Sequence, residues 1–143
     1  MPSIFDFKHI AIVQTAFLGD IALALPLAQS IKDINPDVII SFITTPAGAS
    51  IVALSPAVDN VIAYDKRGLE SGWHGIRLMA DLIKEKKIDC ILALHRSLRT
   101  TLLSKLSGVD YTVSYNTSAM SFLYKKNIKY EKDLHEVERC LTM

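Results

Sequence analysis

The sequence predicts an α/β fold in which a Rossmann-like parallel sheet is flanked by helices. Short apolar runs alternate with segments of helical periodicity, which is the order expected of strands joined by crossover helices. Half of the 143 residues are hydrophobic and 22% are charged, a composition that favours a compact α/β interior. A strand, a helix and a second strand in that order imply a right-handed crossover and a parallel sheet. A chain of this length can bury a core of its own, so we predict a single domain over residues 1–143.

The segment after the first strand is the centre of the predicted fold. Apolar residues 10–13 form this strand, a turn follows with Gly19 at its tightest point, and a helix begins at Asp20. We expect the helix to run to residue 34, with a kink or restart at Pro26. An acid at the start of this helix is either a cap for free backbone amides or a catalyst.

The chain then continues to alternate between strands and helices. Further strands are predicted over residues 38–43, 60–64, 90–94 and 109–115, and further helices over residues 47–54, 76–87 and 98–106. Gly68, Gly72 and Gly75 indicate a mobile loop, and this loop holds Trp73 and His74.

The C-terminal part has weaker signals. Residues 116–132 are expected to form a loop with a short helix near residues 119–124. Residues 134–143 have helical spacing, and the apolar Leu134, Val137 and Leu141 lie on one side that another surface must cover. Because this segment stops without Gly or Pro, we expect a fragment whose partner domain is missing; a small complete protein is the alternative.

Charge and cysteine content exclude several classes of protein. The net charge of +1 gives no reason to expect nucleic-acid binding. No signal peptide is evident, and no apolar run reaches the roughly 18 to 20 residues that a membrane span needs. Cys90 and Cys140 have no spacing typical of a metal site, which fits a reducing cytosol. The sequence therefore predicts a cytosolic protein, peripheral to a membrane at most.

Polar side chains follow each of the first four predicted strands. They are Asp20 after the first strand, Thr44 and Thr45 after the second, Lys66 and Arg67 after the third, and His95 and Arg96 after the fourth. Since ligands of open α/β sheets bind outside the carboxyl ends of the strands, this convergence predicts a site at that edge. A carboxylate among cations suits a general base beside an anionic ligand. The GxGxxG motif is absent, so NAD bound in the usual way is not expected.

Each of these residues also has a purely structural explanation. Asp20 can serve only as a helix cap, and exposed cations are often just solvated. The same applies to Lys66, Arg67, Arg96 and Arg99, and to His135 and Arg139, which lie four residues apart on one helical face.

Four motifs in this order resemble those of a known enzyme family. They are residues 14–20 (QTAFLGD), 64–68 (YDKRG), 95–99 (HRSLR) and 135–139 (HEVER). The chain resembles the amino-terminal half of the ADP-heptose:lipopolysaccharide heptosyltransferases of glycosyltransferase family 9, and most of all their heptosyltransferase II branch. Some relatives carry Lys where Gln14 stands and Ser-Ser where Ala16-Phe17 stands, so a cationic contact at that point is not expected here.

The resemblance implies a fold, an activity and a set of site residues. The fold would be GT-B, with this chain as its acceptor-binding domain and an absent carboxyl-terminal domain that binds ADP-heptose. Asp20 would be the base of an inverting transfer of heptose to the inner core of lipopolysaccharide, without a cofactor or a required metal. The acceptor-binding residues would be Gly19, Lys66, Arg67, Arg96, His135 and Arg139. The chain alone would be inactive, cytoplasmic, and in peripheral contact with the inner membrane.

Two other functions are compatible with the same sequence. One is a flavodoxin-like or receiver-like binding module that is complete as it stands and has no catalytic activity. A receiver needs a cluster of acids after the first strand, and Asp20 has no adjacent acidic residue. The other is a transferase of the same fold that uses a different sugar nucleotide, because a fold does not fix a substrate.

Overall fold

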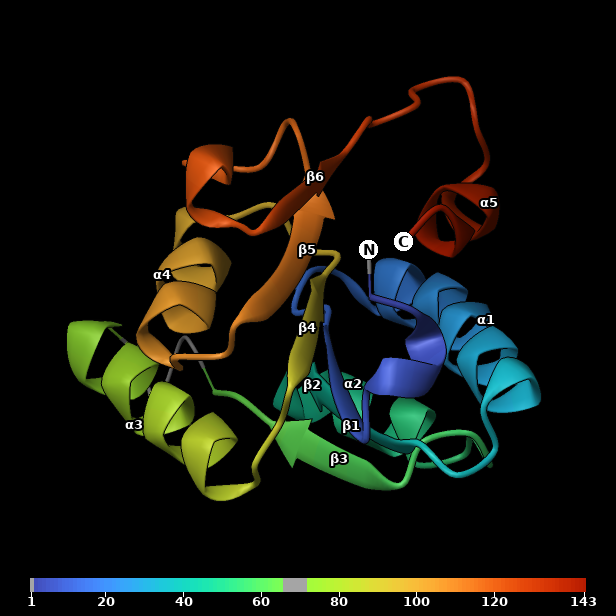
Figure 1. Cartoon of the computed structure of the whole chain (residues 1–143), viewed down its shortest axis with the longest axis horizontal. Helices are drawn as coiled ribbons and strands as arrows, with labels where there is room; N and C mark the ends of the chain where they lie inside the picture. The colour runs from blue at the N-terminus through green and yellow to red at the C-terminus, as the bar shows by residue number, and fades with distance from the viewer. Residues whose placement is uncertain (1, 66–71) are drawn as a thin grey trace.

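The structure of the protein is a computed structural model that describes residues 2–65 and 72–143, and it contains a parallel sheet with helices on both faces (Figure 1). The described strands are β1 (His9–Val13), β2 (Ile39–Thr44), β3 (Asn60–Ala63), β4 (Cys90–Ala93), β5 (Tyr111–Tyr115) and β6 (Lys126–Ile128). The described helices are η1 (Ile4–Asp6), α1 (Leu18–Ile34), α2 (Pro46–Val52), α3 (Gly72–Glu85), α4 (Leu98–Leu106), η2 (Ser121–Leu123) and α5 (Glu136–Leu141). The predicted α/β class and the flanked parallel sheet are confirmed.

The strand order places a reversal at the centre of the sheet. The order is β3-β2-β1-β4-β5-β6, and every neighbouring pair is parallel. From β1 the chain moves outward to β2 and β3, and after α3 it returns to the other side of β1 to form β4, β5 and β6. The point between β1 and β4 is therefore the topological switch point, where open α/β sheets bind their ligands.

Alternate strand residues pack into two separate cores, as expected of a sheet that is buried on both faces. Helices α1, α2 and α5 cover one face, where Ile12 and Phe42 are fully buried. Helices α3 and α4 cover the other face, where Val13 and Ile91 are buried. Figure 1 shows α1 and α5 near the two chain termini, with α3 and α4 across the sheet from them.

Helix α1 begins earlier than predicted and is continuous. Its first residue is Leu18, two positions before Asp20, and it runs through Pro26 to Ile34. Pro26 has no backbone N–H, so the carbonyl of Ala22 lacks its usual helical partner. Ala22 is exposed, so water can reach this carbonyl. Within the described part of the chain, we find no helix with the length and hydrophobicity needed to cross a lipid bilayer.

The prediction that Trp73 and His74 lie in a loop is wrong, because α3 already begins at Gly72. Gly72 has a φ of +69°, which glycine adopts without strain, and Gly75 is buried in the first turn of the helix. Tertiary packing therefore overrides the low helix propensity of these two glycines. Gly68, the third glycine of the predicted loop, lies outside the described residues.

The last third of the chain contains a strand that the sequence did not predict. Strand β6 pairs with β5 at the edge of the sheet, and none of its residues is fully buried, so it lacks the apolar pattern of a central strand. The predicted short helix corresponds to η2. Helix α5 packs on α1 through the fully buried Cys140. Leu134 and Val137 are half-buried and Leu141 is 45% exposed, so the described residues cover the predicted apolar face only in part.

Two aspartates hold the starts of the central strands. The Asp89 carboxylate accepts hydrogen bonds from the backbone N–H groups of Lys8 (2.9 Å) and His9 (3.1 Å), where β1 begins. The Asp59 carboxylate accepts one from the N–H of Ile40 in β2 (2.8 Å). These side chains satisfy backbone donors at the amino end of the sheet, which is the end away from the switch-point pocket.

We predict that Asp59 makes folding stability depend on pH. Partial burial acts to raise the pKa of Asp59, but hydrogen bonds from Lys32 and from the Ile40 amide outweigh it and hold the pKa below its usual value. A carboxyl group of this kind stabilises the fold above its unfolded pKa, and this stabilisation is lost as pH falls through the folded value. Since the side chain is 39% exposed, we expect a loss below about 1 kcal/mol.

Urea unfolding at about pH 7 and about pH 3 measures this effect. The free energy of unfolding should fall less between these two values in Asp59→Asn than in the wild type. Asp37→Asn, at an exposed position, is the control. An equal fall in the wild type and in Asp59→Asn would contradict the prediction.

Candidate functional site

The ends of β1 and β4 are joined by a side-chain hydrogen bond across the switch point. The Oγ1 of Thr15, two residues after β1, lies 2.8 Å from the Nδ1 of His95, two residues after β4. Thr15 is only 3% exposed, and the backbone N–H groups of Leu94 and His95 both donate to the carbonyl of Val13. This arrangement fixes the His95 side chain at the centre of the carboxyl edge of the sheet.

A pocket of about 510 Å³ opens at this edge. The described residues that line it follow four different strands: Thr15, Ala16, Phe17 and Leu18 after β1, Thr45, Pro46 and Ala47 after β2, Tyr64 and Asp65 after β3, and His95 after β4. The predicted convergence of four strand ends on one site is therefore present, with Thr45 and His95 among the predicted residues in the wall. Thr44 does not line the pocket, because it is fully buried beneath α2 near Gly48.

Asp20 lies in the first turn of α1, two residues after the pocket residue Leu18, but it is not among the described residues that line the pocket. Its Oδ2 accepts a hydrogen bond from the backbone N–H of Phe17 at 3.3 Å, which satisfies one free donor at the start of the helix. Asp20 therefore caps α1 from within the helix and not from its first position. The long distance of this bond leaves the carboxylate oxygens able to form stronger contacts.

Gly19 also lies within the first turn of α1 and not at the tightest point of a turn, so that prediction is wrong. Its backbone is not among the described positions of positive φ, and a Cβ added at Gly19 would have no atom within 4 Å. Neither the backbone nor the packing of this chain requires glycine there. The space above Gly19 is open to a ligand.

Lys66 and Arg67, the predicted cations after β3, lie outside the described residues. The preceding residues, Tyr64 and Asp65, line the pocket.

Arg96 projects from the end of β4 over the end of β5. Its Nη1 donates to the Oγ1 of Thr117 at 3.1 Å, and its guanidinium carbon lies 4.1 Å from the centre of the Tyr130 ring. The residue is exposed, so its charge faces solvent beside the pocket residue His95.

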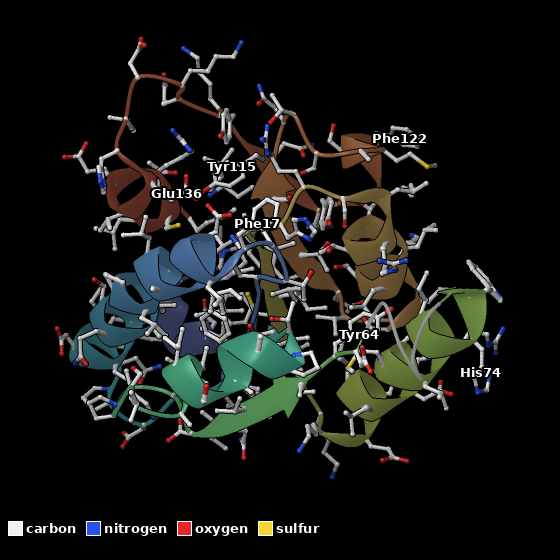
Figure 2. All side chains as sticks on the ribbon, turned by 180° about the vertical axis from the view of Figure 1, so that it is seen from behind. Phe17, Tyr64, His74, Tyr115, Phe122 and Glu136 are labelled. Atoms are coloured by element: carbon white, nitrogen blue, oxygen red, sulfur yellow. The ribbon has the colours of Figure 1, made fainter. Side chains whose placement is uncertain are left out.

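His135 is an exposed residue that begins α5. Its Nδ1 accepts a hydrogen bond from the backbone N–H of Val137 at 3.3 Å, as a helix-capping side chain does. Figure 2 shows Tyr115 and Glu136 on the side of the sheet where α1 begins and α5 packs, whereas His74 lies far from both on α3. His74 is thus distant from Tyr115 and Glu136.

Arg139 is held inside the domain by its own surroundings. Its side chain is only 12% exposed, and each of its five N–H hydrogens has an acceptor. The acceptors are the Tyr130 hydroxyl (2.9 Å), the carbonyls of Glu131 (3.0 Å), Lys132 (3.5 Å) and Leu134 (2.8 Å), and the Glu136 carboxylate. The structure therefore gives Arg139 a role in fixing the segment before α5. Contact with an acceptor stays a prediction and would require release of one of these bonds.

Sequence reasoning missed most of the pocket wall, including Thr15, and it also missed Tyr130, which contacts Arg96. Thr15 follows β1 directly, and its place at a strand end was the signal that could have found it. Tyr130 lies between β6 and α5, in a segment that the sequence predicted as loop, and no periodic signal marks it.

The two cysteines are buried free thiols, and neither lines the pocket. Burial raises the pKa of Cys90 and of Cys140 to about 12, assisted by the charges of Asp89 and Glu136 respectively. Thiols of this kind are unreactive at neutral pH. Within residues 2–65 and 72–143, no three His, Cys, Asp or Glu side chains are grouped as a metal site would require.

Comparison with known proteins identifies glycosyltransferases as similar. The chain is 26% identical over 97 residues to the lipopolysaccharide core heptosyltransferase OpsX of Haemophilus influenzae. The aligned residues are 68% of this chain and 27% of that protein. No protein-family model matches the chain. The chain thus spans about a quarter of the curated relative that it matches.

Solved structures share the fold. A family 9 glycosyl transferase from Veillonella parvula has a TM-score of 0.84 at 23% identity, over 94% of this chain and 40% of that one. Heptosyltransferase WaaC of E. coli with ADP has a TM-score of 0.79 at 20% identity, over 94% and 45%. E. coli ADP-heptose lps heptosyltransferase II has a TM-score of 0.74 at 17% identity, over 94% and 39%. The resemblance to family 9 heptosyltransferases is confirmed, whereas the assignment to the heptosyltransferase II branch stays a prediction.

The hydrogen bonds that the Arg139 guanidinium donates predict that replacing this residue lowers stability. Arg139→Ala should lower the free energy of unfolding by about 2 to 3 kcal/mol, because it leaves several carbonyls and the Glu136 carboxylate without their partner. Arg139→Lys keeps the charge but loses the planar fork, so its loss should be intermediate. Urea unfolding measures both variants, with Glu138→Ala, at an exposed position of the same helix, as the control. If Arg139→Ala is as stable as this control, the structural role is wrong.

Proposed function

We propose that this chain, which resembles the family 9 heptosyltransferases over most of its length, is the acceptor-binding half of a transferase that moves heptose from ADP-heptose to the inner core of lipopolysaccharide. One observation carries the proposal: the carboxyl ends of four strands surround a pocket beside the first turn of α1, which holds Asp20. A site at the switch point of an α/β sheet is suited to a small polar ligand.

Asp20 is proposed as the general base. Its carboxylate would take the proton of the attacking acceptor hydroxyl, whose oxygen forms a bond to the anomeric carbon of the heptose. The bond from that carbon to the phosphate oxygen breaks, and ADP leaves with the electron pair. Attack from the face opposite the leaving group inverts the configuration at the anomeric carbon. The hydrogen bond from the Phe17 amide would hold the carboxylate in place while the proton is transferred.

Cationic side chains are proposed to hold anionic groups of the acceptor. Arg96 is exposed and next to a residue that lines the pocket, which favours it for this role. The family resemblance supports the same role for Lys66, Arg67 and His135. Arg139, which the resemblance also implies, has all five N–H hydrogens bonded within the domain, so we do not propose direct contact for it. Planar guanidinium groups bind carboxylate and phosphate through two parallel hydrogen bonds.

The donor ADP-heptose is proposed to bind a second domain that these residues do not contain, as in a GT-B enzyme. The isolated chain would then bind acceptor weakly and transfer no sugar. We place the enzyme in the cytoplasm, where it would meet its acceptor at the face of the inner membrane.

The role of Asp20 is tested by Asp20→Asn in the protein at its natural length. Asn keeps an oxygen that can accept from the Phe17 amide, so the helix start and the fold should be preserved. Loss of the base should lower kcat by roughly 10²- to 10⁴-fold at saturating acceptor. Asp20→Ala should in addition destabilise the protein by about 0.5 to 2 kcal/mol. Turnover and melting temperature separate the two effects, and a fully active Asp20→Asn enzyme would end the catalytic proposal.

Gly19→Ala tests whether the open space at the start of α1 receives a ligand. The variant meets no clash and no unfavourable φ, so better helix propensity should raise stability by up to about 1 kcal/mol. The added methyl group should weaken acceptor binding, seen as a raised KM for acceptor. Ser50→Ala, on the exposed side of α2, is the control. A more stable variant with an unchanged KM would remove Gly19 from the site.

A further inference from the structure

Two arginines of the candidate site share one aromatic ring. The guanidinium carbon of Arg96 lies 4.1 Å from the centre of the Tyr130 ring, and that of Arg139 lies 4.4 Å from it. Cations over an aromatic face are attracted to it, by more when the cation is partly removed from water. The three residues come from the end of β4, from the segment after β6 and from α5, so only the folded chain brings them together.

The two arginines differ in how many of their donors are available. All five N–H hydrogens of Arg139 have acceptors within the domain. Among the described residues, the Arg96 side chain donates one hydrogen bond, to Thr117, itself an exposed residue. The residue as a whole is exposed to solvent. Arg96 is therefore the member of the pair that can bind an anion.

Tyr130 is fixed from several directions. Its hydroxyl accepts from Nη1 of Arg139 at 2.9 Å, and its backbone N–H donates to the Oδ1 of Asn116 at 3.1 Å. Its ring meets the buried ring of Tyr115 edge to face at 5.2 Å. Since the Tyr115 hydroxyl also donates to the carbonyl of Arg139, these residues form one rigid unit between β5 and α5.

Arg96 is held against this unit by backbone and side chain alike. Its carbonyl accepts from the N–H of Ala119 at 3.0 Å, and its guanidinium lies between the Tyr130 ring and the Thr117 hydroxyl. A long side chain that is ordered before binding loses less conformational entropy when it binds. A guanidinium held in one orientation also suits binding through two parallel hydrogen bonds.

We propose that Tyr130 is a positioning residue that orders Arg96 as a clamp for an anionic group of the acceptor, and that Arg139 acts through Tyr130 and not by touching the acceptor. The proposal rests on the proposed acceptor-binding role of this chain and names the group bound as a carboxylate or a phosphate monoester. Arg96 follows His95, which lines the pocket, so the clamped anion lies at the pocket edge nearest β5.

The first test measures anion binding by the 143-residue chain, using inorganic phosphate and acetate as probes at low salt. Chemical shifts of the backbone N–H at position 96, which every variant keeps, report binding in NMR titrations. Tyr130→Leu removes the ring, and Arg96→Lys removes the planar fork, so each should weaken binding by about 3- to 10-fold. Tyr130→Phe keeps the ring and should stay within about twofold of the wild type. Phe122→Leu, an exposed aromatic, is the matched control and should have no effect.

The outcomes distinguish the source of the anion and can overturn the proposal. If the variants bind only phosphate more weakly than the wild type, the clamped group is a phosphate. If they bind only acetate more weakly, it is a carboxylate. A folded Tyr130→Leu chain that binds both probes as the wild type does would overturn the proposal. So would a wild-type chain that binds neither probe at Arg96.

A second measurement needs no variant and applies even if Tyr130→Leu fails to fold. The order parameter of the Arg96 Nε–H bond in the wild type should be clearly higher than that of Arg77, which is exposed on α3. Equal mobility of the two side chains would overturn the proposal.

In the protein at its natural length, Tyr130→Leu should raise the KM for acceptor about 3- to 10-fold with kcat little changed, because it removes ground-state binding. Tyr130→Phe should restore the KM. Loss of kcat in Asp20→Asn reports a different step, so failure of the base assignment and failure of the clamp are separate results. A lowered kcat with unchanged KM in Tyr130→Leu would overturn the positioning role.

Discussion

The reversal of strand order between β1 and β4 is the constraint from which the candidate site follows. Both strands are central and parallel, but the helices that follow them leave on opposite faces: α1 packs on one core and α4 on the other. No helix can then cover the junction itself, so the residues that end the two strands meet there. The hydrogen bond between Thr15 and His95 spans this junction, and the pocket opens over it.

The two ends of the sheet are finished in different ways. At the amino end, Asp59 and Asp89 accept hydrogen bonds from backbone N–H groups, and the buried His9 bridges the Lys86 carbonyl and the Ser41 hydroxyl. The polar atoms there are used to complete the fold. At the carboxyl end, His95 lines a pocket and Arg96 is exposed beside it, so a cationic side chain meets solvent at that end.

Sequence reasoning found the elements that local patterns determine. The central strands are continuous apolar runs, and helix α4 lies over the predicted residues 98–106. It failed where long-range packing decides: α3 includes Gly72 and Gly75, and β6 is an edge strand without alternation. The meeting of strand ends was predictable because parallel topology requires it. The contact between Arg96 and Tyr130 was not, because no local rule relates residues that far apart in sequence.

Because long-range contacts are not visible in a sequence, the cations of the motifs could not be distinguished by function. Arg96 and Arg139 both lie in stretches that resemble heptosyltransferase motifs, and from charge alone either suits a phosphate or a carboxylate. Their surroundings separate them, since a guanidinium whose five hydrogens already have acceptors must break a bond before it can bind a ligand, whereas an exposed one loses only water. Motif resemblance thus locates the cationic edge of the sheet. The hydrogen bonds and burial of Arg139 point to a role in folding that edge, and the exposure of Arg96 is the reason that we propose it, and not Arg139, for recognition.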